Sequence, residues 1–324
     1  MKHYRVTLYQ SQDFNLWNTF ISVAKNATFL FHRNFMEYHS DRFQDYSLLV
    51  FDENQLIAVL PANRVGATVY SHQGLSYGSL VVKEDIRIKE YVTIVKELMQ
   101  FLQTNGVENF EIKLLPKIYN ITISDEMDYV AFLMQSSLFR TDVYLTMDMQ
   151  IDYQPNRNRK RALKIASELR IEIKEEKNYN GFWNQILIPN LQERFRVSPV
   201  HSYEEIEKLA DLFPENILLF NAYQDNVLKA GVVMFLTETV AHFQYSSGGN
   251  DRNDTAALDV LFDFIIQKYA HKKYVSFGSS SEDNGLKLNE GLAYWKESFG
   301  AKTTVQSFHR FQTSNHYLLD TVLL

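Results

Sequence analysis

The chain has 324 residues, of which 45% are hydrophobic and 22% charged, and its formal net charge is −6 at pH 7. This composition is typical of a globular protein with one large or two medium domains, and the negative charge disfavours DNA binding by the surface as a whole. The absence of cysteine excludes disulfides, a thiolate nucleophile and a zinc–thiolate site. We find neither a signal-peptide pattern nor a run close to the roughly 18 apolar residues of a membrane span, so we expect a cytoplasmic protein without a transmembrane segment.

The first half of the chain begins with a segment, residues 17–39, that we expect to be helical. Residues 47–60, SLLVFDENQLIAVL, are two apolar runs around a polar turn, which predicts a β-hairpin, and 67–82 predict a third strand. Residues 88–106 have apolar side chains at three-to-four spacing and end in glycine, so they predict a helix. A strand at 107–115, then a helix and a strand within 129–149, complete this half.

The second half shows the same order. Two helical segments, 157–170 and 181–195, precede a predicted hairpin at 217–234 and a strand at 239–250. A helix at 254–273 follows, with an acidic start and a basic end that suit the helix dipole. A strand at 273–279 and a helix and strand within 292–311 come last.

Hairpin, strand, helix, strand, helix and strand therefore occur twice, which indicates an internal duplication. The alternative is a chance similarity of two unrelated α/β segments. Proline and asparagine interrupt the pattern near 150–156, so we place the domains at 1–152 and 153–324. The fold class is α/β (α+β).

Several segments carry a family resemblance: SHQGLSYGSL (71–80), RNRKRALKIAS (157–167), SPVHSYEEIEKLADLFPENILLF (198–220), AHFQYSSGGN (241–250) and FGSSSEDNGLKLNEGLAYWKESFG (277–300). With the repeated topology, they resemble the GNAT acyltransferase fold present twice in one chain, as in the Fem-type aminoacyl transferases and the Fem-like, GNAT-family proteins of bacterial polysaccharide loci. The resemblance implies two tandem GNAT-like domains, each a mixed, mostly antiparallel sheet flanked by helices. It also implies a substrate-binding first domain and a catalytic second domain, because only the second contains YWKESFG.

The segment that corresponds to the GNAT pyrophosphate loop reads GGNDRNDTAALDVL, residues 248–261, and departs from the family pattern. Amides at a helix N-terminus attract phosphate, whereas Asp251 and Asp254 oppose it. Acyl-CoA is still the expected co-substrate, with four cofactor-binding candidates: Ser246, Ser247, Gly248 and Gly249. Fem-type relatives also lack the usual loop and take an aminoacyl group from tRNA, which leaves aminoacyl-tRNA as the alternative donor.

Lys296 is the first catalytic candidate. In Fem-type enzymes, a lysine in a motif similar to YWKESFG lies in the active-site cleft, and an ammonium there stabilises a developing oxyanion. The alternative is a lysine on an amphipathic helix whose amine extends to solvent.

Glu282 is the second catalytic candidate, because it follows the strand that ends at Gly278. A carboxylate in such a loop can take a proton from an attacking ammonium, and Ser280 beside it can bind sugar hydroxyls or phosphates. The alternative is a solvated loop that caps the next helix.

Tyr245 is the third catalytic candidate, at the end of a strand that splays from its neighbour in GNAT folds, where free backbone N–H groups polarise the acyl carbonyl. The resemblance makes it a general acid for the leaving group, and the alternative is a core tyrosine. His242 and Gln244 share one face of this strand, and so polar a face favours a cleft wall.

The remaining candidates are substrate-binding residues. His72 and Tyr77 belong to a glycine-rich segment that the resemblance places on the cleft between the domains, although a bend with a buried histidine is the alternative. Arg157, Arg161 and Lys164 share one helix face that can bind phosphates, or that is simply solvated. Arg194 and His201 are weaker candidates for the same acidic substrate.

Together these residues predict an acyltransferase that moves an acyl group from acyl-CoA to the amine of an amino sugar or cell-envelope precursor. The expected partner is a small or lipid-linked acidic sugar, without a metal, because the nine histidines lack metal-binding spacing. One alternative is a Fem-type transferase that uses aminoacyl-tRNA. The other is a non-catalytic protein that binds a saccharide or lipid precursor.

Overall fold

The computed structural model describes residues 3–249 and 252–322, without the side chains of 194, 195, 252 and 253. The chain divides into two compact units, which we call unit 1 (1–142 and 305–324) and unit 2 (143–304). These units differ from the expected halves, 1–152 and 153–324, in the assignment of two strands. Residues 144–148 of β8 (Ser137–Asp148) pair with a strand of unit 2, whereas residues 308–312 of β16 (Lys302–Gln312) pair with a strand of unit 1.

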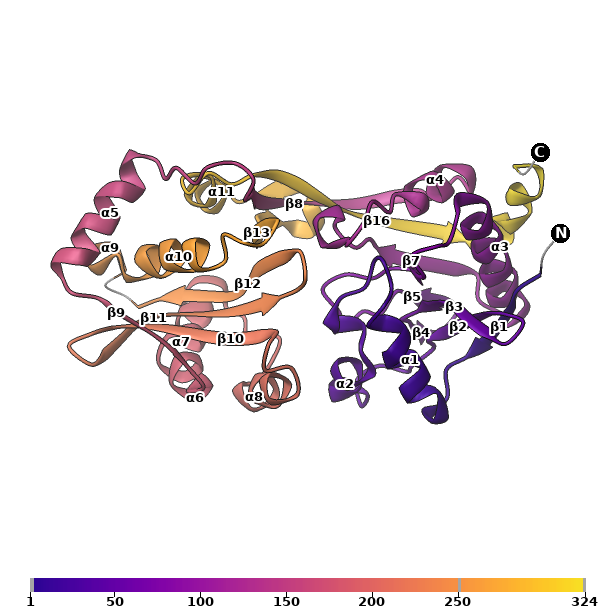
Figure 1. Cartoon of the computed structure of the whole chain (residues 1–324), viewed down its shortest axis with the longest axis horizontal. Coiled ribbons are helices and arrows are strands. Elements are labelled where there is room, and N and C mark those ends of the chain that lie inside the picture. Colours follow the sequence, from indigo (N-terminus) through magenta and orange to yellow (C-terminus); the bar gives the residue numbers. More distant parts are fainter. Residues whose placement is uncertain (1–2, 250–251, 323–324) are drawn as a thin grey trace. The chain divides into compact units, whose positions relative to one another are not determined.

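Unit 1 contains a four-stranded antiparallel sheet with the strand order β1-β2-β3-β6 (Figure 1). Four further strands of this unit, in the order β4-β5-β7-β16, belong to a second sheet. The strands are β1 (Arg5–Leu8), β2 (Leu48–Asp52), β3 (Gln55–Leu60), β4 (Asn63–Val65), β5 (Thr68–Tyr70), β6 (Val81–Val82) and β7 (Asn109–Lys113). The α-helices are α1 (Phe14–Ile21), α2 (Arg33–Met36), α3 (Ile88–Thr104) and α4 (Glu126–Leu133). Short 3₁₀ turns lie at Ser11–Asp13, Phe29–Phe31, Glu37–His39, Lys117–Tyr119 and Thr313–Thr321.

The core of unit 1 forms where the apolar stripe of α3 meets the sheet. Its side chains at three-to-four spacing, among them Tyr91, Val95, Leu98 and Leu102, are buried in one cluster with Val50 and other strand residues. The predicted helix at 88–106 is therefore confirmed, and its amphipathic pattern explains why it covers the sheet.

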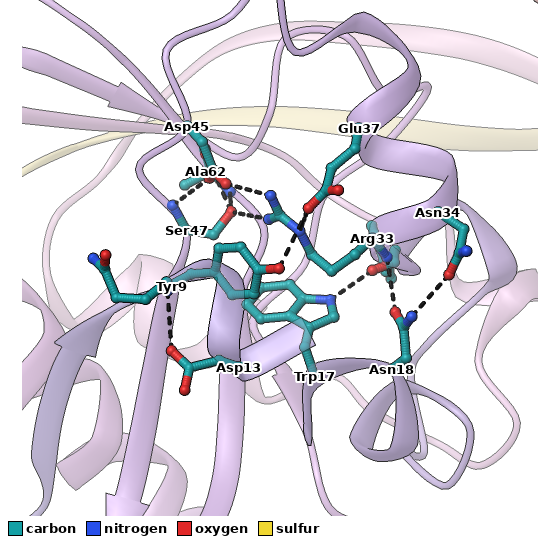
Figure 2. Close-up of polar contacts among 12 residues, drawn as sticks. Tyr9, Asp13, Trp17, Asn18, Arg33, Asn34, Glu37, Asp45, Ser47 and Ala62 are labelled. Carbon is teal, nitrogen blue, oxygen red and sulfur yellow. Dashed lines mark hydrogen bonds and ion pairs between the residues drawn. The ribbon is translucent and has the colours of Figure 1, made fainter. Parts of the chain in front are cut away.

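Arg33 is buried within unit 1 and anchors the start of α2 (Figure 2). Its guanidinium donates to Glu37 at 3.0 Å and Ser47 at 3.2 Å, pairs with Asp45, and lies 3.8 Å from the centre of the Tyr9 ring. A buried charge is tolerated when its donors are satisfied in this way. Arg33 therefore has the contacts of a structural residue.

Two expectations for unit 1 are wrong. Residues 17–39 do not form one helix, because the Asn26 side chain bonds to Leu80 O (2.9 Å) and Val82 N (3.0 Å) and so ties the chain between α1 and α2 to β6. Residues 67–82 do not form one strand either. They give β5 and β6, which belong to two different sheets.

Unit 2 has strands in the order β8-β13-β12-β11-β10-β9, antiparallel except for the parallel pair β12–β13 (Figure 1). The strands are β9 (Glu172–Glu176), β10 (Ile217–Gln224), β11 (Val227–Leu236), β12 (Val240–Gly248) and β13 (Tyr274–Ser279), with a small hairpin of β14 (Ser281–Glu282) and β15 (Lys287–Leu288) around a 3₁₀ turn at Asp283–Gly285. The helices are α5 (Arg157–Glu168), α6 (Tyr179–Phe182), a π-helical turn (Trp183–Leu187), α7 (Ile188–Phe195), α8 (Tyr203–Leu212), α9 (Arg252–Thr255), α10 (Ala257–Lys268) and α11 (Glu290–Glu297). A mixed, mostly antiparallel sheet flanked by helices is confirmed.

Helix α10 covers one face of the unit 2 sheet, and α6, α7 and α8 lie on the other (Figure 1). Phe262 of α10 stacks on Phe243 of β12, with ring centres 3.9 Å apart, and both join a buried cluster with Phe277 of β13. Because side chains alternate along a strand, the neighbours of Phe243 and Phe277 point away from α10. No helix in the described ranges is long and apolar enough to cross a membrane.

Candidate functional site

Strands β12 and β13 separate after three residue pairs. Val240, Ala241 and His242 pair in parallel with Tyr274, Val275 and Ser276, and no further pair joins the two strands within the residues described. Strand β12 nevertheless continues to Gly248 alongside β11. The splay expected for this strand is present, and we call the region bounded by Phe243–Gly248 of β12 and Phe277–Ser279 of β13 the β12–β13 fork.

On the side of β12 that faces the fork, the backbone does not pair with β13 after His242 within the described residues. The amide of Gly249 donates to Lys229 O at 2.7 Å, so by alternation the peptide groups of Ser246 and Gly248 point away from β11. A register shift opposite Val233 and Met234 leaves Gln244 as the extra residue of a β-bulge. Asn190 of α7 bonds to the Gly248 carbonyl and to Ser247 Oγ (2.7 Å), which closes the far end of this edge.

Lys296 of α11 lies at the point where β13 leaves β12. Its side chain is buried, and Nζ donates to Gly278 O at 3.1 Å and to Ser279 O at 2.6 Å. Burial lowers the pKa of Lys296 from 10.5 to about 7, because the charged form loses its hydration. The ammonium therefore loses its proton near neutral pH.

His242 lies in the last residue pair before the fork, opposite Ser276, where it is partly exposed. Its Nδ1 is 3.1 Å from Ser276 Oγ, and a Cβ placed on Gly278 would lie 3.3 Å from its ring. Gly278 has φ +70°, a conformation that favours glycine, so this residue allows the turn and the close approach together. Burial, and then the positive charge of Lys296, lower the pKa of His242 to about 4, so the ring is neutral at pH 7.

Tyr245 points toward α8 and the segment before it. Its hydroxyl is 2.6 Å from Nδ1 of His201, accepts from the His201 amide at 3.4 Å and is bonded to the Gln244 side chain. Its ring packs edge-on against Trp183, with ring centres 5.1 Å apart, and burial raises its pKa to about 12. These contacts bring three of the predicted residues, Tyr245, His201 and Gln244, into one group.

Glu282 lies on the β14–β15 hairpin and is exposed. It accepts a hydrogen bond from Asn289 at 2.7 Å, and no ion pair joins it to Lys296 in the described part of the chain. Ser280, by contrast, is buried, and its hydroxyl has no hydrogen-bond partner among the described residues. Ser280 is therefore the polar group of this loop that adjoins the carbonyls bound by Lys296.

The cofactor-binding candidates lie at the end of β12. Ser246 is exposed and Gly248 buried, and the bonds of Gly249 to Lys229 and of Ser247 to Asn190 are those of the sheet edge described above. A phosphate would have to break the Gly249–Lys229 bond to use that amide.

The start of α10, which would face a pyrophosphate, carries a carboxylate. Asp259 in its first turn pairs with Arg159 and accepts from Trp295 Nε1 at 3.0 Å. The residue before the helix is Ala256, in a left-handed conformation, and its methyl side chain cannot cap the helix. This end of α10 is thus already neutralised from within the protein.

The basic residues Arg157, Arg161 and Lys164 are exposed on α5, and Lys164 lies 3.9 Å from Glu168. Helix α5 adjoins α11, because Asn158 donates to the Tyr294 hydroxyl at 3.2 Å. The side chain of Arg194, another candidate, lies outside the described residues.

The two candidates in unit 1 are buried. His72 has φ +66° and stacks on His39 at 5.1 Å, and burial lowers its pKa to about 3. The hydroxyl of Tyr77 donates to Thr28 Oγ1 at 3.0 Å, and its ring packs against Phe31.

Sequence reasoning missed Asn190, Ser276 and the specific role of Gly278. Asn190 follows a proline and a π-helical turn, a helix defect that is frequent at functional sites and that only the backbone reveals. In the described ranges, no group of three or more histidine or acidic side chains is arranged to hold a metal ion.

No protein-family model matches this chain, and no curated protein matches its sequence. Solved structures match it closely in fold. FemX has a TM-score of 0.68 at 10% identity, over 97% of this chain and 99% of that one. The structure of L-PGS from Bacillus licheniformis has 0.55 at 10% identity, over 96% of both chains.

A tandem GNAT protein from the clavulanic acid biosynthesis pathway has a TM-score of 0.50 at 9% identity, over 96% of this chain and 99% of that one. The chain therefore has the fold of FemX and of the tandem GNAT protein, with two GNAT-like domains in tandem. The fold expected from the sequence is confirmed.

Proposed function

We propose that the protein is an N-acyltransferase whose reaction takes place at the β12–β13 fork. The observation that carries the proposal is the fork itself: β12 keeps its peptide groups toward β13 after His242, but β13 has turned away. Peptide N–H groups fixed in this way can bind the carbonyl oxygen of an acyl group and stabilise the oxyanion that forms on attack. The remaining catalysis would come from holding an amine and an acyl carbon together.

The residues around the fork supply the other groups. Lys296 adjoins the point of attack, neutral His242 and Gln244 lie on β12, and Ser280 packs beside the carbonyls that Lys296 binds. Because the hydroxyl of Tyr245 is already bonded to His201, we assign Tyr245 a positioning role in place of the general-acid role expected from the sequence. Glu282, exposed and bonded to Asn289, contributes to the rim of the site.

The donor proposed from the sequence is acyl-CoA. The start of α10 favours a second candidate, because Asp259 occupies the end of the helix where a pyrophosphate would lie. An aminoacyl ester of tRNA needs no pyrophosphate site there, and the exposed basic face of α5 can bind its phosphates. Fem-type transferases use such a donor.

The acceptor would be an amine on an amino sugar or on a cell-envelope precursor, within bacterial polysaccharide or envelope biosynthesis in the cytoplasm. An acidic or lipid-linked sugar would suit the basic face of α5. We propose that the domain at 153–324 is catalytic and that the domain at 1–152 binds substrate.

The test is a transfer assay with the full chain. Acetyl-CoA and alanyl-tRNA serve as donors and UDP-glucosamine and glucosamine as acceptors, with amide products identified by mass spectrometry. Transfer from acetyl-CoA supports the first donor and transfer from alanyl-tRNA the second. Melting shifts with acceptor but no product with either donor would favour a saccharide-binding protein.

A pair of variants tests the site. Ser246→Pro removes an N–H from the open edge of β12 without touching the bonds to β11, whereas Ser246→Ala keeps it. We expect Ser246→Pro to lower kcat by about 100-fold and Ser246→Ala to retain it, since one oxyanion donor contributes roughly that much. Circular dichroism confirms that both are folded, and equal rates in the two variants would remove the fork from the mechanism.

A further inference from the structure

Lys296 is a buried amine without a counter-ion. Only 4% of its surface is exposed, and no carboxylate forms an ion pair with it among the residues that the structure describes. Its hydrogen-bond partners are two neutral carbonyls, Gly278 O and Ser279 O. A buried ammonium normally requires a paired acid, so this environment favours the neutral amine.

The two carbonyls bind the amine in either charge state. A neutral amine has two N–H groups, which suffice for Gly278 O and Ser279 O, and its lone pair then occupies the remaining position. An ammonium places its third N–H there. Proton uptake and release at Lys296 therefore leave its anchoring hydrogen bonds intact.

The groups that face Lys296 are few. From β12 comes His242, which is near enough for the Lys296 charge to lower its pKa. On β8, the backbone of Tyr144 pairs with Ser279, whose carbonyl Lys296 binds. On the adjoining hairpin Asp283 lies 3.2 Å from Lys287, and Glu282 is bonded to Asn289. Burial is the single cause of the lowered pKa of Lys296, so no neighbouring charge holds its proton.

We propose that Lys296 is a proton shuttle for acyl transfer, an inference that rests on the proposed function. The acceptor reacts as a neutral amine. As its nitrogen bonds to the acyl carbon, neutral Lys296 takes one proton from that nitrogen. As the bond from the acyl carbon to the leaving oxygen or sulfur breaks, the Lys296 ammonium returns the proton to the leaving atom, so the lysine ends the cycle neutral.

This role differs from those expected from the sequence. There, Glu282 was the proton acceptor, Tyr245 the acid and Lys296 a fixed positive charge. In the structure, the first is exposed and the second is bonded to His201, whereas the third loses its proton near pH 7 and adjoins the fork. One side chain can thus serve both proton transfers.

The first experiment is independent of catalysis. In the full chain labelled with ¹³C at lysine Cε, the Lys296 resonance is assigned by its loss in Lys296→Arg and followed from pH 5 to 11. We expect a midpoint near 7. A midpoint above 9 would overturn the shuttle whatever the transfer assays give.

The second experiment compares Lys296→Arg with Lys272→Arg. Lys272 is a matched control in unit 2, because its Nζ also donates to two successive carbonyls, Thr237 O at 2.6 Å and Glu238 O at 3.3 Å. Arginine can keep such hydrogen bonds but does not release its proton. With the donor and acceptor pair that gives product, we expect kcat to fall at least 100-fold in Lys296→Arg and to change less than twofold in Lys272→Arg.

Chemical rescue separates a shuttle from a fixed charge. Trimethylamine can carry a proton but cannot form an amide. When it is added to Lys296→Ala, we expect the transfer rate of this variant to rise at least tenfold, with a pH optimum that follows the pKa of trimethylamine. Near-normal transfer by Lys296→Arg, or no rescue of a folded Lys296→Ala, would overturn the shuttle alone. Failure of every donor and acceptor pair in the wild-type chain would instead overturn the proposed function, and the shuttle with it.

Discussion

Two parallel strand pairs within the described residues begin alike and end differently. In unit 2, β12 and β13 pair over three residues and then separate. In unit 1, β5 and β7 also pair over three residues, Thr68–Tyr70 with Asn109–Glu111, but the chain then folds back and pairs again where Gly78 bridges Leu114. The arrangement in unit 2 leaves the fork. In unit 1, residues 71–78 fill the corresponding position between β5 and β7.

The loop at 71–78 is fixed to β7 by polar contacts. The backbone amide of Lys113 donates to Ser71 Oγ at 3.2 Å, and its carbonyl accepts from the Gly78 amide at 2.7 Å. Its Nζ donates to Gln73 O at 3.2 Å and to Leu75 O. Residues 71–78 therefore lie beside β7 where the corresponding part of β13 turns away from β12. One topology therefore supports an open or a filled junction, and the loop residues decide which.

Each junction contains a lysine that binds loop carbonyls. Burial lowers the pKa of Lys113 to about 8 and that of Lys296 to about 7. Lys113 extends from the strand itself and holds the filling loop in place, whereas Lys296 extends from helix α11 and binds carbonyls on the far arm of the fork. The following changes test this contrast.

The largest expected effect comes from Gly78→Ala, which attacks the filled junction. A Cβ there would lie 2.2 Å from Ser71 Oγ and 2.5 Å from Ser71 backbone oxygen, and a backbone atom cannot simply rotate away. We expect a loss of about 3 kcal/mol in the free energy of unfolding, measured by urea denaturation. Gly291→Ala, at an exposed position of α11, is the control and should cost nothing. Equal midpoints for the two variants would contradict the tight packing.

Lys296→Met tests the open junction through pH. The unfolded lysine binds its proton up to pH 10.5 and the folded one only up to about 7. Between these values the unfolded state holds the extra proton, so wild-type stability rises with pH, and below pH 7 the full penalty of a buried charge applies. Between pH 7 and 10, the free energy of unfolding of the wild type should rise by about 3 kcal/mol relative to that of Lys296→Met, as measured by urea denaturation. If the two plots of stability against pH are parallel, the pKa of Lys296 is not shifted.

His72 gives the corresponding test in unit 1 at acid pH. Its pKa is about 3 in the folded state against 6.5, so the unfolded state takes up a proton first as pH falls, and stability present above pH 6.5 is lost toward pH 3. Asparagine tolerates the left-handed backbone at this position. Between pH 6.5 and 4.5, the free energy of unfolding should fall by about 2 kcal/mol less in His72→Asn than in the wild type, as measured by urea denaturation. An unchanged acid slope would mean that the ring is not held neutral.

The smallest effect is expected for Ser71→Ala. This change removes the hydroxyl that accepts from the Lys113 amide but leaves the bond between Gly78 and Lys113 in place. A loss of about 1 kcal/mol follows from one hydrogen bond. Hydrogen exchange at the Gly78 amide should quicken, and unaltered exchange would show that the loop does not depend on Ser71.

Several features were predictable because they depend on local pattern. The apolar spacing of α3 and of α10 and the turns between β2 and β3 and between β10 and β11 specify these elements from their own residues. Repetition of the order then gave the tandem fold, which the solved structures confirm. The helix expected after residue 292 is present as α11, which contains Lys296, whereas the catalytic role of Lys296 stays a prediction.

Other features required the tertiary structure, because they depend on residues far apart in the chain. Residues 17–39 contain enough helix formers for one helix, yet Asn26 bonds to Leu80 and Val82 and breaks it. Residues 67–82 form strands of two sheets for a similar reason, since their partners, β7 and β3, lie elsewhere. Neither partner can be inferred from the segment itself.

Local residue patterns specify most of the elements, their order and the identity of the polar side chains near Lys296. Long-range packing sets the burial of Lys296 between two carbonyls with no ion pair among the described residues, the bond of Tyr245 to His201 and the exposure of Glu282. Hydrophobic periodicity is encoded every three or four residues, whereas the charge state of an amine depends on every group packed around it.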